Sequence, residues 1–260
     1  MIGSYLRALT RWSVRDTLPP GEVIVDVTAD PAHLARYSQV CGFPADGPLP
    51  PTYPHVLAFP AALGLLTRRD FPLPALGLVH VANRIVQRRP IDPAERLTIR
   101  VRPDRLRAEP AGTAVDLLVS AIADDEPVWE SVSTYLRRGP RSPGTRRADP
   151  PTAGAESWLW DVPAGTGRRY AAVSGDRNPI HLHAVTARAF GFRTAIAHGM
   201  WAKARVLAAR ELPPSFAVDV AFRAPIPLPS SVRLASDGQR FALTTPDGGR
   251  THLSGELTDA

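Results

Sequence analysis

The chain contains two related segments, and this internal repeat limits the folds that it can adopt. Residues 36–42, RYSQVCG, match residues 169–175, RYAAVSG, without a gap and with four of seven positions identical. Farther along, Pro54-His55-Val56 and Ala197-His198-Gly199 each lead into an apolar run. The second copy has ten more residues than the first between these two landmarks. We expect two domains of one architecture, with an insertion in the second copy only.

A linker is expected between the two copies. Residues 137–152, RRGPRSPGTRRADPPT, are rich in proline, glycine and charge and have no apolar periodicity. Such a composition is typical of a connecting segment. The sequence thus predicts an N-terminal domain over residues 1–136, a linker over residues 137–152 and a C-terminal domain over residues 153–260.

Each copy shows the same order of expected elements: a strand, a short helix with the Arg-Tyr pair, an apolar helix and a run of strands. Consecutive strands without intervening helices predict an antiparallel sheet. The apolar helices are expected near residues 59–67, with Pro60 in the first turn, and residues 200–210. We expect an α+β fold, in which each half is a curved antiparallel sheet wrapped around its apolar helix. The expected strands are residues 22–27, 77–88, 96–102, 113–122 and 128–137 in the first copy, and 157–162, 216–222, 231–236, 240–244 and 251–257 in the second.

Composition limits the class of protein and its partners. No apolar run approaches the roughly 18 residues that cross a bilayer, and the N-terminal residues do not read as an export signal. Cys41 is the single cysteine, which fits a reducing compartment, so we expect a cytoplasmic protein without a membrane partner. The net charge is +6, but the arginines are scattered and only Lys203 among 31 basic residues is lysine. We therefore expect no nucleic-acid partner, although a basic rim would suit a phosphorylated substrate handle.

The inserted stretch concentrates polar chemistry in ten residues, SGDRNPIHLH, from Ser174 to His183. Pro179 disfavours helix at Asn178, which predicts a turn that returns His181 to the side of Asp176. A carboxylate and an imidazole beside one water molecule form an acid–base pair that works near neutral pH. Asn178 would orient a partner or hold the turn through its own backbone.

A second candidate functional feature is the pair His198-Gly199, at the expected start of the second apolar helix. The first amides of a helix have no acceptor within the helix and lie at the positive end of its dipole. Glycine lets a ligand approach the Gly199 amide, which is thus predicted to stabilise an oxyanion. We expect His198 to pack at the helix entrance rather than titrate. Together the residues indicate proton and water transfer beside an activated carbonyl.

The inserted stretch also allows two other interpretations. Asp176 in an Asp-Arg-Asn turn can simply cap a helix, but His181 and Gly199 together favour catalysis. His181-Leu182-His183 places two imidazoles on one face of an extended segment, as in some transition-metal sites. No further ligand set accompanies them in the sequence. We expect neither a metal site nor a cofactor.

The segment from Tyr170 to His181, YAAVSGDRNPIH, followed by Gly191-Phe192 and Ile196-Ala-His-Gly-Met200, resembles the hydratase 2 motif. This motif marks the MaoC-like, hot-dog fold dehydratases and (R)-specific enoyl-CoA hydratases. The resemblance implies a double hot-dog fold and reversible hydration of enoyl thioesters to (R)-3-hydroxyacyl thioesters. It also implies that Asp176 and His181 are the catalytic pair and that the Gly199 amide binds the thioester carbonyl. Asn178 and His198 are further candidates for contact with the substrate.

The first copy lacks these features. It has no Asp-x-Asn-Pro-x-His sequence, and Val56 stands where the second copy has Gly199. We expect this half to be non-catalytic and to shape the acyl pocket. The expected activity is that of a hydro-lyase acting on an acyl-CoA substrate. The alternatives are an acyl-carrier-protein dehydratase of fatty-acid or polyketide synthesis, or a non-catalytic acyl-thioester-binding subunit; a homodimer is compatible with each.

Overall fold

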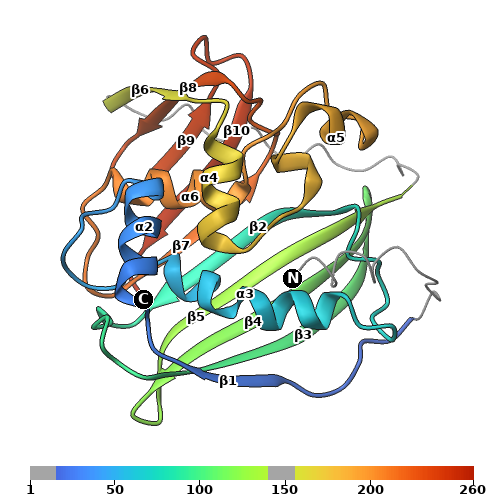
Figure 1. Cartoon of the computed structure of the whole chain (residues 1–260). Helices are drawn as coiled ribbons and strands as arrows, with labels where there is room; N and C mark the ends of the chain where they lie inside the picture. The colour runs from blue at the N-terminus through green and yellow to red at the C-terminus, as the bar shows by residue number, and fades with distance from the viewer. Residues whose placement is uncertain (1–15, 140–155) are drawn as a thin grey trace.

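The computed structural model describes residues 16–139 and 156–260. In these ranges ten strands form one antiparallel sheet in the order β1-β3-β4-β5-β2-β7-β10-β9-β8-β6 (Figure 1). The first copy contributes β1 (Val23–Val27), β2 (Leu78–Gln87), β3 (Leu97–Glu109), β4 (Gly112–Ala123) and β5 (Glu126–Arg138). The second contributes β6 (Glu156–Val162), β7 (Phe216–Phe222), β8 (Ser230–Ser236), β9 (Arg240–Thr244) and β10 (Thr251–Thr258).

The two copies meet edge to edge at the middle of this sheet. There β2 pairs with β7 in antiparallel register, from Ala82 opposite Ala221 to Gln87 opposite Phe216. Read outward from this junction, the first copy runs β2-β5-β4-β3-β1 and the second β7-β10-β9-β8-β6. The strands at equivalent places in the sheet also occupy equivalent places along each copy. The prediction of two antiparallel halves of one architecture is confirmed.

The Arg-Tyr segments form α2 (Pro31–Cys41) and α4 (Thr166–Ser174), which pack against each other. Helix α2 begins where the Asp30 carboxylate accepts a hydrogen bond from the His33 amide. Both helices end at a glycine in the left-handed region, Gly42 with φ 83° and Gly175 with φ 77°. The repeated glycine thus terminates the same helix in each copy.

The apolar helices are α3 (Tyr53–Leu66) and α6 (Gly199–Ala208), and each lies on the concave side of its half of the sheet (Figure 1). The predicted start of α3 near residue 59 is wrong, because the helix begins six residues earlier and Pro60 lies inside it. Tyr53 and Val56 are buried in the core, and this packing extends the helix upstream of the proline. Pro60 has no N–H to donate to the carbonyl of Val56.

The additional residues of the second copy form η1, a 3-10 turn (Pro179–His181), and α5 (Ala184–Ala189). Of the predicted linker, Arg137 and Arg138 belong to β5, where they pair with Thr113 and Gly112. Gly139 follows the strand, and residues 140–152 of that segment lie outside the described residues. No helix in the described ranges is both long enough and apolar enough to cross a membrane.

Candidate active site

Asp176 and His181 are brought together by the short turn that the sequence predicts. Helix α4 ends at Gly175, and Asn178 then adopts an extended backbone with ψ 126° before Pro179 opens η1. The Asp176 carboxylate accepts a hydrogen bond from the Asn178 amide at 3.1 Å, and the Asn178 side-chain oxygen accepts one from the Ile180 amide. Asn178 therefore holds the turn through its side chain.

The imidazole of His181 has a fixed orientation and a defined tautomer. Its Nδ1 lies 2.8 Å from the carbonyl oxygen of Ile196. Because a carbonyl only accepts, Nδ1 carries the proton and Nε2 carries the lone pair. The amide of Ile196 in turn donates to the carbonyl of Ile180, so one residue holds both η1 and the ring. The Nε2 atom has no hydrogen-bond partner among the described residues, and His181 lines a cavity.

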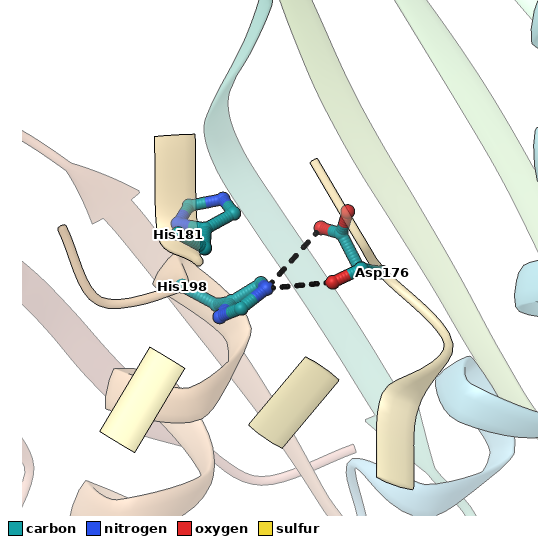
Figure 2. A group of neighbouring side chains, drawn as sticks. All are labelled: Asp176, His181 and His198. Carbon is teal, nitrogen blue, oxygen red and sulfur yellow. Dashed lines mark hydrogen bonds and ion pairs between the residues drawn. The ribbon is translucent and has the colours of Figure 1, made fainter. Parts of the chain in front are cut away.

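His198 is the N-cap residue of α6 and lies between His181 and Tyr170. Its Nε2–H donates to the backbone carbonyl of Asp176 at 3.0 Å, and the Asp176 carboxylate lies 3.9 Å from the same nitrogen (Figure 2). Burial lowers the pKa of His198 to about 3, helped by the neighbouring His181, so the ring is neutral. A neutral donor that ties the Asp176 loop to α6 matches the expected packing role.

The three functional groups converge on one point. A carboxylate oxygen of Asp176 and a ring nitrogen of each histidine lie within 4.8 Å of one another. A water molecule about 2.8 Å from two such atoms joins them when they are about 4.6 Å apart. A separation of no more than 4.8 Å is compatible with one water molecule between the Asp176 carboxylate and the His181 ring.

A metal ion fits this cluster poorly, although the residue types are those of metal ligands. The rings of His181 and His198 are stacked, with centroids 3.7 Å apart and planes inclined by 25° (Figure 2). Each ring also uses one nitrogen to donate to a backbone carbonyl. Because the lone pairs of stacked rings lie in nearly parallel planes, an ion at about 2.0–2.1 Å from both nitrogens would lie out of plane for at least one ring.

Gly199 is the first residue of α6, and it lines the same cavity. No acceptor receives a hydrogen bond from this amide in residues 16–139 and 156–260. A Cβ atom at this position would lie 3.0 Å from the ring of Phe222, so the helix end and β7 approach each other closely. The amide is thus available to a substrate oxygen next to the Asp176–His181 pair.

These residues line a cavity of about 270 Å³ to which both halves contribute. The first half supplies apolar side chains from α3 and β2, among them Phe59, Leu63 and Leu78. It also supplies His55, the counterpart of His198, whose pKa burial lowers to about 4. Arg138 also lines the cavity and is exposed. His183, by contrast, is exposed at the start of α5.

Two positions that hold His181 were missed from the sequence. Ile196 is one, since its carbonyl fixes the ring. Gly167 in α4 is the other, because a Cβ atom there would lie 2.0 Å from the carbonyl oxygen of His181. A signal for Gly167 exists in the repeat itself: when the two Arg-Tyr segments are aligned, the first copy has Leu34 at this place.

Comparison with known proteins supports this arrangement of the fold. Residues 151–234 match a family model described as a MaoC like domain. The chain is 38% identical to 3-hydroxyacyl-thioester dehydratase X of Mycobacterium tuberculosis over 229 residues, covering 84% of this chain and 81% of the relative. The crystal structure of HtdX of Mycobacterium tuberculosis superimposes with a TM-score of 0.81 at 35% identity, covering 92% of this chain and all of that one.

A more distant structure shows the fold alone. A Mycobacterium tuberculosis protein whose structure is described as a double hotdog fold matches with a TM-score of 0.53 at 11% identity, over 93% of this chain and 96% of that one. Together with the two antiparallel halves and their enclosed helices, this agrees with the expected double hot-dog architecture. The chain belongs to the MaoC-like dehydratase family.

Proposed function

We propose that this chain is a hydro-lyase that reversibly adds water to enoyl thioesters and removes it from 3-hydroxyacyl thioesters. The observation that carries the proposal is the convergence of the Asp176 carboxylate and the His181 imidazole within 4.8 Å, at the wall of a cavity that Gly199 also lines. The relative named 3-hydroxyacyl-thioester dehydratase X supports the substrate class.

In the hydration direction, His181 serves as the base. Its Nε2 lone pair takes one proton from the bound water as the oxygen adds to C3 of the enoyl thioester. The Asp176 carboxylate accepts the second O–H of that water and stabilises the imidazolium, since it raises the pKa of His181 that burial lowers. The electron pair of the double bond moves onto the thioester oxygen, where the Gly199 amide donates a hydrogen bond.

The cycle closes when the imidazolium returns its proton to C2. The water oxygen and one proton then reside on C3, the second proton resides on C2, and His181 is neutral again. Dehydration is the same sequence in reverse. The product expected from the family resemblance is the (R)-3-hydroxyacyl thioester.

The first half is proposed to be non-catalytic and to shape the acyl pocket over residues 1–136, with the catalytic domain over residues 153–260. The apolar side chains of α3 and β2 that line the cavity support this division. The proposed carrier is coenzyme A, with acyl carrier protein as the alternative, and the exposed Arg138 at the cavity edge would contact its phosphate groups.

The test is turnover of crotonyl-CoA, followed by loss of enoyl absorbance in the ultraviolet. Asp176→Asn and His181→Ala are each expected to lower kcat by on the order of 10²–10⁴, the typical contribution of acid–base catalysis. His183→Ala is the matched control, because this imidazole is exposed two residues away. Binding of acyl-CoA without turnover, at every chain length tried, would instead support an acyl-binding subunit.

A further inference from the structure

Lys203 is the only lysine in the chain, and it is completely buried in the middle of α6. Its ammonium group reaches across the junction of the two halves. It donates to the side-chain oxygen of Asn83 at 2.6 Å, to the backbone carbonyl of Asn83 at 3.0 Å and to the carbonyl of Val218 at 3.3 Å. Asn83 lies on β2 of the first half, and Val218 lies on β7 of the second.

The network continues into the first half. The Asn83 side-chain amide donates to the hydroxyls of Ser131 at 2.8 Å and Ser133 at 3.0 Å, both on β5. All four side chains are buried. The three donors of the ammonium group are matched by three oxygens, and burial lowers the pKa of Lys203 well below its usual range. A fully satisfied buried network of this kind fixes one arrangement of the elements that it joins.

The network lies close to the start of α6, where Gly199 is. Lys203 lies four residues, about one helical turn, after Gly199. At Gly199 the helix start already lies against Phe222 of β7, with the Cβ position only 3.0 Å from the ring. The helix thus lies close to β7 at its first residue and is hydrogen-bonded to β2 and β7 one turn later.

We propose that Lys203 is a positioning residue that holds the Gly199 amide in register with the substrate carbonyl, by tying α6 to Asn83 of the non-catalytic half. This inference rests on the proposed function, because it assigns the Gly199 amide to the thioester oxygen. It gives the first half a part in catalysis beyond enclosing the acyl chain: β2 carries the acceptor that locates the oxyanion donor.

Three variants separate positioning from stability. Lys203→Met keeps the length of the side chain and removes the three hydrogen bonds. Lys203→Met combined with Asn83→Leu removes both side chains of the shortest hydrogen bond, so the Asn83 side-chain oxygen is not left buried without its donor. Arg205→Met is the control. It removes another cation from the same helix, a partly exposed guanidinium that lies over the ring of Trp160.

Two measurements are made on each variant, well below its melting temperature. The first is kcat and KM with crotonyl-CoA. The second is the ratio of affinities for butyryl-CoA, a thioester, and S-butyl-CoA, a thioether that lacks the carbonyl oxygen. We expect the single and double variants to lose kcat by on the order of 10-fold to 100-fold with KM nearly unchanged. We expect their preference for the thioester over the thioether to fall by about threefold to tenfold, and Arg205→Met to match the wild type.

The double variant decides the question. We expect it to regain part of the melting temperature lost by Lys203→Met, because the Asn83 side-chain oxygen is no longer left without its donor, while kcat and the thioester preference stay low. Recovery of kcat and of the thioester preference in a stable double variant overturns the proposal, since the network is then only structural. Absence of turnover by the wild-type protein with crotonyl-CoA and with crotonyl-acyl carrier protein would refute the proposed function instead.

Discussion

Gly167 offers a sharp test of how the His181 turn is held. It lies in α4, and a Cβ atom there would lie 2.0 Å from the carbonyl oxygen of His181, whereas ordinary contacts begin at 3.4 Å. The obstacle is backbone, which cannot rotate away as a flexible side chain can. In Gly167→Ala, α4 and η1 must therefore move apart by roughly the difference between these two distances.

The magnitude of the effect follows from this displacement. His181 belongs to the turn that has to move, and its Nδ1 bond to Ile196 has a length of 2.8 Å in the undisturbed protein. A misplacement of about 1 Å costs roughly 10²-fold in rate, so we expect kcat to fall by about that factor. Helix propensity acts in the opposite direction, because alanine is favoured over glycine inside a helix by about 1 kcal/mol.

The assay is turnover of an enoyl thioester, with the melting temperature measured in parallel. Gly165→Ala is the matched control two residues earlier, where the closest atom to an added Cβ is a flexible arginine nitrogen at 4.0 Å. We expect kcat of this control within about twofold of the wild type, since no displacement of η1 is required. Wild-type kcat in Gly167→Ala would refute the reasoning that this contact positions His181.

Two further predictions concern pH. His181 must be neutral to act as a base. Its pKa lies below the ordinary value of 6.5, because burial lowers it by more than Asp176 raises it. The value of kcat/KM for hydration should therefore rise with pH below 6.5 and then level off. In Asp176→Asn the residual activity should show this limb at lower pH; a shift upward would contradict the assigned interaction. The free energy of unfolding should also fall in acid. Burial lowers the pKa of His55 to about 4 and those of His80 and His198 to about 3 in the folded protein. In the unfolded chain these histidines take up protons near pH 6.5, so acid favours unfolding. The slope is about 1.4 kcal/mol per pH unit for each such histidine between pH 6.5 and 4, seen as a falling melting temperature, and it should be shallower in His55→Gln.

The parts of the site that could be predicted from sequence are those whose signals are local. Asp176, Asn178 and His181 lie within six residues, and Pro179 dictates the turn between them. The strands were predicted to within a few residues for most of the sheet, because alternation and turn residues mark them in the chain. For β3 the prediction ended at residue 102, whereas the strand continues to Glu109.

Contacts between residues distant in sequence account for what could not be predicted. The acceptor of Lys203 lies 120 residues away on β2, and the carbonyl that fixes the His181 ring is 15 residues away. Neither leaves a pattern in the chain. The start of α3 was also misplaced, because the burial of Tyr53 and Val56 outweighs the local preference that Pro60 expresses.

The inactivity proposed for the first half has a physical basis that one variant can probe. Val56 occupies the place of Gly199, is buried and lines the cavity. Between Gly42 and His55 the chain has a single acidic residue, Asp46, which is exposed, and it has no counterpart of η1. Val56 also lies inside α3, three residues after its first residue Tyr53, so Val56→Gly would enlarge the cavity without creating a second helix-start amide or an Asp–His pair.

We expect Val56→Gly to leave kcat with crotonyl-CoA within about threefold of the wild type, because Asp176, His181 and Gly199 are untouched. The cavity grows by the volume of the lost side chain, so KM should fall for acyl chains branched near the thioester more than for straight ones. The decisive measurement is turnover by Asp176→Asn combined with Val56→Gly, which should stay as low as Asp176→Asn alone. Restored turnover would mean that the first half holds a base of its own, and that the chemistry does not depend on the inserted turn.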